Sequence, residues 1–140
     1  MLSAKTQYAV LALLELVHEQ SDGRPAPAAR IAERHGIPAT FLVQILHELK
    51  RAGLVVSTRG ANGGYRLSRS AGEVTLADVV DVLDSTEPTT ECAAGESPFA
   101  AALGEICGDL ARARREVLSS VTLADLADRG AAATGPMWYI

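Results

Sequence analysis

The chain has 140 residues, a hydrophobic fraction of 48% and a net charge of -4 at pH 7. This length suits one domain, or a small domain with an oligomerisation element, and the apolar content suffices for a core. No apolar run approaches the roughly 20 residues needed to span a bilayer, and the N-terminus lacks a signal-peptide pattern, so we expect a cytoplasmic protein. Two cysteines, Cys92 and Cys107, are too few for a disulfide scaffold.

The charge is divided unevenly along the chain. Residues 1–70 hold nine Lys or Arg against five Asp or Glu, a net charge of +4, whereas residues 71–140 hold four against twelve, a net charge of -8. This asymmetry favours a DNA-facing half joined to an acidic, partner-facing half. Two ordinary solvated surfaces would give the same count.

The first predicted helix runs from about Ala4 to Glu19, with Ser3 as its N-cap. Glu15 and Glu19 fall off its apolar stripe. The stripe consists of Tyr8, Ala9, Ala12, Leu13, Leu16 and Val17.

Two further helices follow a turn at residues 21–25. The first covers 28–35 and ends at Gly36. The second has Pro38 in its first turn and continues to Ala52, with Gly53 as its C-terminal stop. Two helices separated by a Gly-centred turn form a helix-turn-helix.

The second helix of this motif is the one that enters the major groove. Its buried stripe is expected at Leu42, Ile45, Leu46 and Leu49, which leaves Ala39, Thr40, Val43, Gln44 and His47 free to face DNA. Gln44 can donate and accept on an adenine edge, and Thr40 can bond a base or a phosphate. His47, Lys50 and Arg51 are expected nearer the phosphates. The alternative is that Thr40 and Gln44 are ordinary solvated helix residues.

Strand-like runs at 54–57 and 65–68 flank a Gly-rich turn, which predicts a two-stranded wing. Arg59 at its entrance is placed to enter a narrow minor groove, and the glycines allow close backbone approach to phosphates. The alternative is that Arg59 pairs with a surface carboxylate. The complete predicted DNA-binding set is Thr40, Phe41, Gln44, His47, Lys50, Arg51, Ser57, Arg59, Gly60, Asn62, Gly63 and Gly64.

A helix capped by Thr75 is predicted to end near Asp84 and to pack on the first helix. Residues 85–97 are polar and predict a loop, after which Pro98 opens a helix of about twenty residues. We expect this helix to bury an apolar stripe against a second copy of itself. The stripe is Phe99, Leu103, Ile106, Leu110, Ala113, Val117 and Leu118.

The remaining segment, from Val121 to Asp125, repeats the capped start seen at 74–78, which we interpret as repeated capping chemistry. The apolar ending at 136–140 is expected to dock on protein. The predicted fold is mainly α (α+β), with a winged helix-turn-helix domain over 1–84, a loop over 85–97, and a dimerisation helix and tail over 98–140.

These residues resemble the bacterial Rrf-two family, which includes the regulators IscR, NsrR and CymR. The resemblance covers nearly the full length. It implies a homodimeric winged-helix transcription factor, a repressor that binds operator DNA and responds to a redox, iron-sulfur or cysteine-metabolism signal. The matching segments are 2–5 with Tyr8-Ala9, 31–37, Phe41-Leu42 with Gln44, 52–55, 59–67 and 122–126.

Several family members hold an iron-sulfur cluster on three cysteines, and here the pattern departs from them. Cys92 matches the first of those positions, but Cys107 lies fifteen residues later and no third cysteine exists. A resident cluster is therefore not expected, and Cys92 is the residue that would ligate one. Cys92 and Cys107 are also candidate redox thiols, although Glu91 and Glu96 should raise the pKa of Cys92. Cys107 is interpreted mainly as a small buried apolar residue.

The family's cluster-free members are similar to this chain in their aromatic-rich ending, here Trp138-Tyr139-Ile140, and imply a protein partner at the tail. Val43 departs from the acidic residue that many members carry, so their base preference does not carry over. The alternative function is a protein-interaction module built on a winged helix. An enzyme is not expected, because the sequence offers no nucleophile with a base and no carboxylate pair at a defined spacing.

Overall fold

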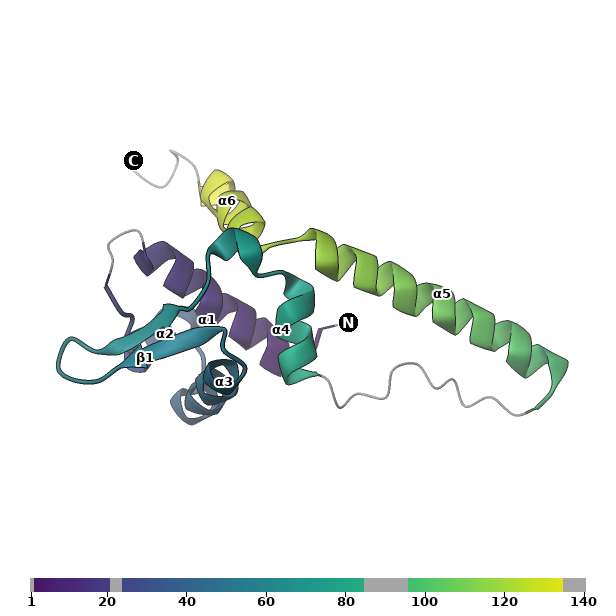
Figure 1. The fold of residues 1–140 in the computed structure, drawn as a ribbon, viewed down its shortest axis with the longest axis horizontal. Coiled ribbons are helices and arrows are strands. Elements are labelled where there is room, and N and C mark those ends of the chain that lie inside the picture. The colour runs from purple at the N-terminus through teal and green to yellow at the C-terminus, as the bar shows by residue number, and fades with distance from the viewer. Residues whose placement is uncertain (1, 21–23, 85–95, 135–140) are drawn as a thin grey trace.

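The computed structural model describes residues 2–20, 24–84 and 96–134. A bundle of helices carries a two-stranded wing, and one long helix extends away from it (Figure 1). None of the helices in these ranges combines the length and apolar character needed to span a bilayer. The elements in chain order are α1 (Ala4–Gln20), α2 (Ala28–His35), α3 (Ala39–Arg51), β1 (Val55–Thr58), β2 (Gly64–Leu67), the 3-10 helix η1 (Ala71–Glu73), α4 (Leu76–Leu83), α5 (Pro98–Ser120) and α6 (Leu123–Thr134).

The predicted helix ends are confirmed by their capping contacts. Ser3 Oγ accepts the backbone N–H of Thr6 at 3.1 Å and so caps α1. Gly36 ends α2 in the left-handed conformation at φ 63°, which a residue with a Cβ adopts at a cost. Pro98 opens α5, and Ser97 Oγ accepts the N–H of Ala100 at 3.1 Å.

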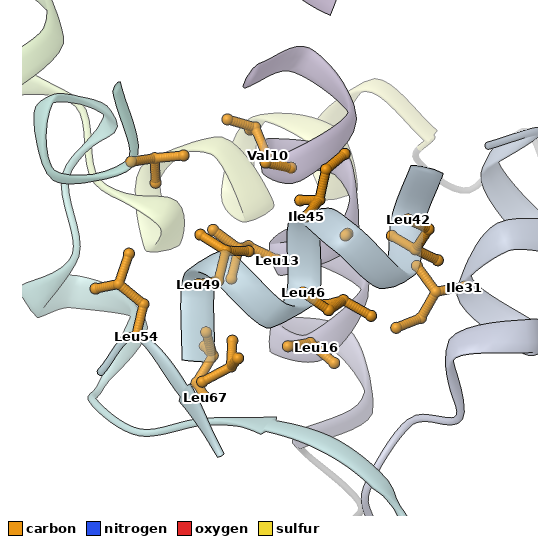
Figure 2. Packing of buried hydrophobic residues seen from close by; sticks show 14 of the residues in the cluster. Val10, Leu13, Leu16, Ile31, Leu42, Ile45, Leu46, Leu49, Leu54 and Leu67 are labelled. Carbon is orange, nitrogen blue, oxygen red and sulfur yellow. The ribbon is translucent and has the colours of Figure 1, made fainter. Parts of the chain in front are cut away.

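The core lies between α1, α3 and the base of the wing (Figure 2). Leu13 and Leu16 of α1 meet the buried face of α3, and Leu54 and Leu67 close the side next to the strands. The α3 residues on this face are Leu42, Ile45, Leu46 and Leu49, each 0% exposed, as the helical spacing predicts. Close packing on that face fixes which side of α3 remains open to solvent.

The wing is an antiparallel pair, each strand lying within one residue of its predicted position. Val55 pairs with Leu67 at the buried base, and Thr58 pairs with Gly64 at the other end. A Cβ at Gly63 would collide with the carbonyl oxygen of Thr58, and a Cβ at Gly64 would lie 2.5 Å from the carbonyl oxygen of Ala26. The lack of a side chain at these two glycines therefore allows close packing within the chain itself. The role predicted for them was close approach of the backbone to phosphates.

The loop before α2 is joined to the wing by backbone hydrogen bonds. Ala26 N–H donates to the Tyr65 carbonyl at 2.9 Å, and Tyr65 N–H donates to the Ala26 carbonyl at 2.8 Å. The wing is thereby attached to the start of the helix-turn-helix by a contact between residues far apart in the sequence.

The repeated capping sequences start α4 and α6, and they also pair with each other. Thr75 and Asp78 form a reciprocal capping box, and Thr122 and Asp125 form the same pair of hydrogen bonds. The backbone N–H of Leu76 donates to Val121, and that of Leu123 donates to Val74, both at 2.9 Å. This short bridge places α6 against α1, where Leu123 is fully buried.

Glu15 lies off the predicted apolar stripe, yet its side chain is buried between α1 and α2. Arg34 Nη1 lies 2.5 Å from Glu15 Oε1, and His35 Nε2 lies 3.0 Å from Oε2. Burial disfavours the charged carboxylate, but the hydrogen bonds from His35 and Arg34 outweigh it and hold the pKa of Glu15 below its ordinary value. Helical periodicity assigns charged residues to the outside, and here partners from another helix reverse that assignment.

We call α1–α4, the wing and α6 together the head, and α5 the arm. The C-terminal end of the arm packs on α4, where Leu118 contacts Ala77 and Val80. Arg115 also forms two hydrogen bonds to Asp81, at 2.6 and 2.9 Å. Beyond this junction the arm extends from the head on the side opposite the wing (Figure 1).

Candidate nucleic-acid interface

The exposed face of α3 carries most of the residues that the sequence analysis selected for DNA contact. Thr40, Gln44, His47, Lys50 and Arg51 are all exposed, opposite the leucine-rich buried face. Lys50 and Arg51 occupy the last turn, where cations also interact favourably with the helix dipole. The structure thus brings hydrogen-bonding groups and cations onto one surface of the helix.

Phe41 differs from the other selected residues of α3 because its ring belongs to the head. The ring is half-buried and packs edge-to-face on Tyr8, with centroids 5.7 Å apart and planes at 85°. Phe41 therefore holds the start of α3 against α1. Its place in the DNA-binding set remains a prediction.

A hollow of about 380 Å³ on the α3 face is lined by Lys5, Val43, Gln44, His47 and Glu48. Lys5 reaches it from α1, and its Nζ lies 3.0 Å from Glu48 Oε1 and 2.7 Å from Oε2. The ion pair compensates a carboxylate that would otherwise repel phosphates. The sequence analysis assigned Lys5 no role, because no local pattern reveals a contact between α1 and α3.

The selected wing residues separate into an exposed and a half-buried group. Ser57, Arg59, Gly60 and Asn62 are exposed. Gly63 and Gly64 are half-buried against the chain itself, as described above. Arg59 follows β1 directly, at the entrance to the turn, as predicted.

A second hollow, of about 600 Å³, lies between the wing turn and the segment leading into α2. Its lining includes Arg24, Arg30, Asn62 and Gly63. Arg30 Nη2 also lies 3.1 Å from Glu19 Oε2. Both arginines were missed by sequence reasoning, since the backbone bridge from Ala26 to Tyr65 is what brings them to the wing.

The helix α3 and the wing both lie in the head, away from the free end of the arm (Figure 1). In Figure 1 the wing extends at the left and α3 lies at the bottom of the head, whereas the arm extends to the right. A duplex contacting α3 and the wing would therefore approach the head from the side away from the arm.

Within residues 2–20, 24–84 and 96–134, no group of three or more His, Cys, Asp or Glu side chains is arranged to hold a metal ion. Cys107 lies half-buried on the arm, so the expectation that it is buried is not met. Its neighbours on the arm are largely exposed, which explains the difference. Cys92 and the apolar ending at 136–140 lie outside the described residues.

Comparison with known proteins identifies the family of this chain. A family model described as Rrf2, an iron-dependent transcriptional regulator, matches residues 2–129. The chain belongs to the Rrf2 family. The ORF2 protein of Azotobacter vinelandii, which carries the name of an HTH-type transcriptional regulator, is 37% identical over 134 residues, covering 91% of this chain and 79% of that protein. The HTH-type transcriptional regulator IscR of Photobacterium profundum is 41% identical over 91 residues.

Solved structures of Rrf2 proteins match this chain over nearly its whole length. IscR of T. potens superposes with a TM-score of 0.78 and 32% identity, covering 99% of this chain and 96% of that one. CymR of B. subtilis, titled the global cysteine regulator, superposes with a TM-score of 0.77 and 33% identity, covering 92% and 97%. The match to Photobacterium IscR covers 65% of this chain and 52% of that protein, so this Rrf2 chain spans about half the length of that relative.

The predicted fold class and family resemblance are confirmed by these matches. This Rrf2 chain is a DNA-binding transcriptional regulator and not an enzyme.

Proposed function

We propose that the protein is a homodimeric repressor that reads a pseudo-palindromic operator with α3 in the major groove and the wing in the minor groove. The observation that carries the proposal is the exposed face of α3, which presents Gln44 with Lys50 and Arg51, on a helix that lies in the head together with the wing (Figure 1). A helix of this width fits the major groove, and its polar groups are free of intramolecular packing.

Each group on α3 has a distinct part in this binding mode. Gln44 reads an adenine through its amide, which donates and accepts at once. Thr40 bonds a base or a phosphate. His47, Lys50 and Arg51 contact the backbone, where they add affinity without reading sequence.

Arg59 carries the wing contact. Its guanidinium enters the minor groove, where a narrow A·T-rich stretch has an enhanced negative potential. Ser57, Gly60 and Asn62 present polar groups beside it, and Arg24 and Arg30 neutralise phosphates along the same edge.

The arm supports the homodimer, because most of its apolar stripe is exposed. Phe99, Leu103, Ile106, Leu110 and Val117 are 87%, 55%, 55%, 65% and 62% exposed. With Ala113 they follow alternating spacings of four and three, which is the seam of a coiled coil. Leu118 and Arg115 occupy the other face, which packs on α4. A second copy offers the same stripe and closes the interface with two-fold symmetry.

The DNA contacts are tested by fluorescence anisotropy with an operator selected from a random duplex library. We expect Arg59→Ala to weaken operator binding by about 1 to 3 kcal/mol, as loss of a groove contact does. Lys50→Ala should weaken operator and random duplex alike and reduce the salt slope by about 1. Arg112→Ala, which removes an exposed arginine of the arm, is the charge-matched control and should change neither. Equal effects of Arg59→Ala on operator and random duplex would contradict the assignment.

The dimer is tested by analytical ultracentrifugation. The wild-type protein should sediment as twice the chain mass of 14.7 kDa. Leu110→Asp should give a monomer, because a charge in the apolar seam is left desolvated. Glu116→Gln, outside the stripe on the same helix, should remain dimeric. A Leu110→Asp variant that stays dimeric would show that the stripe is not the interface.

The signal is proposed to act without a resident iron-sulfur cluster, since each chain has two cysteines where the cluster-binding members of the family use three. Iron and acid-labile sulfide assays on anaerobically purified protein test this, together with its visible absorption. A colourless, iron-free dimer that binds its operator supports the proposal. Cluster absorption with matching iron and sulfide would overturn it and make Cys92 a ligand.

The C-terminal tail is proposed as a docking site for a protein partner that carries the cysteine-metabolism or redox signal. Deleting residues 136–140 should abolish partner capture while operator affinity stays unchanged. If neither form binds DNA, the protein is an interaction module and the repressor proposal fails.

A further inference from the structure

Val43 stands out on α3 because its exposure serves no packing purpose. Its side chain is 50% exposed, whereas those of Leu42, one residue before it, and Ile45, two residues after it, are 0% exposed. It is the one large apolar side chain on the open face of α3, all of whose residues the structure describes. A β-branched residue also disfavours a helix slightly compared with alanine or lysine, so helix formation gives no reason for it.

The neighbours of Val43 place it at the centre of the face that meets DNA. Thr40, Val43 and His47 are spaced by three and four residues and therefore share one side of the helix. Val43, Gln44 and His47 line the same hollow, which the ion pair of Lys5 and Glu48 borders. An apolar surface is thus surrounded by groups that we assign to base and phosphate contact.

The major groove offers one apolar group among the four bases, the C5-methyl of thymine. Valine suits this group because its restricted χ1 holds two methyl groups in a fixed direction before binding. Val43 and Gln44 are adjacent in α3 and line the same hollow, so in the major groove their side chains reach neighbouring base pairs.

We propose that Val43 is a specificity-determining residue that recognises the C5-methyl group of a thymine within one base-pair step of the adenine read by Gln44. This inference rests on the proposed function, since it requires α3 to lie in the major groove. It assigns each half-site an A·T-containing dinucleotide read by an apolar contact and an amide in adjacent positions.

The test replaces thymines of the selected operator one at a time by deoxyuridine, which lacks the methyl group. Replacing one particular thymine of a half-site should lower the affinity of the wild-type protein about fourfold, which corresponds to the burial of one methyl group. Replacing that thymine in both half-sites should lower the affinity about sixteenfold. Replacement of the other thymines should leave the affinity unchanged.

Substitution of Val43 supplies the second measurement. Val43→Ala should bind the thymine and uracil operators equally, because the contact is gone, and its circular dichroism should match the wild type since alanine favours the helix. Lys50→Ala is the matched control from the same face, and it should weaken both operators while keeping the fourfold ratio.

An operator that shows no sensitive thymine overturns the inference, and so does a Val43→Ala variant that keeps the wild-type preference for thymine over uracil. The proposed function itself fails if the wild-type protein enriches no sequence from the library. The two failures are thereby distinguishable.

Discussion

The head and the arm differ in how much of their apolar surface is buried within the chain. In the head, α3 has four residues fully buried against α1 and the wing base, although it is only 13 residues long. The arm has 23 residues, and Leu118 is the single one described as buried. The head closes its own core, whereas the arm leaves exposed the apolar stripe that we propose as the dimer interface.

The difference shows why the same helical periodicity has two structural outcomes. The stripe of three leucines and one isoleucine on α3 is buried because short turns bring neighbouring elements into contact with it. Among the described residues, the extensive contacts of the arm are those with α4. An exposed apolar stripe of this length fits the proposed interface between two chains.

The largest expected effect concerns core packing. Leu46→Ala in the head should lower the free energy of unfolding by about 2 to 5 kcal/mol, because it leaves a cavity at a fully buried site. Urea denaturation measures this, and the loss should be the same at every protein concentration.

Ile106→Ala on the arm is the matched truncation in the open region. Its effect should depend on protein concentration, because the proposed interface forms between two chains. Equal, concentration-independent losses for both variants would remove the distinction between head and arm.

The next effect concerns the buried carboxylate of the head. Glu15→Gln should cost about 1.5 to 3 kcal/mol at pH 7, the contribution of hydrogen bonds to a charged group. The folded-state pKa of Glu15 is lowered, so its contribution is present above its ordinary pKa of 4.5 and is lost as the pH falls through the folded value. Urea midpoints between pH 7 and pH 3 should therefore fall more steeply for wild type than for Glu15→Gln.

Glu33→Gln, an exposed carboxylate of α2, provides the control and should follow the wild-type pH dependence. If Glu15→Gln and wild type show parallel pH dependence, the ion pair does not contribute to the stability of the head.

The smallest effect compares two helix caps. Thr75→Ala should lower the global free energy of unfolding by about 1 kcal/mol, because Thr75 caps α4 inside the cooperative head. Ser97→Ala removes the cap of the arm, whose first turn is exposed. That variant should speed amide hydrogen exchange in the first turns of α5 with little change in global stability. A global loss equal to that of Thr75→Ala would show that the arm folds as part of the head.

Much of the fold is predictable from local sequence. Ser3, Gly36 and Pro98 mark helix ends through capping chemistry that acts over a few residues, and the glycines at 63–64 mark the turn of the wing. The buried face of α3 follows from its spacing alone. The same spacing also left Gln44 and Lys50 on the open face, which is where the structure places them.

Other features depended on contacts between residues distant in the sequence. Neither the burial of Glu15 nor the pairing of Lys5 with Glu48 follows from the pattern of one helix, because each needs a partner on another helix. The bridge from Ala26 to Tyr65, which carries Arg24 to the wing, is of the same kind.

The sequence by itself determined the order of the elements, their ends and which face of each helix is apolar, since these follow from backbone capping and from the period of the helix. Only the tertiary structure decided which of those faces is covered within the chain. That outcome depends on which elements the turns return to one another, so α3 became the buried wall of the head while the stripe of α5, equally apolar in pattern, remained exposed.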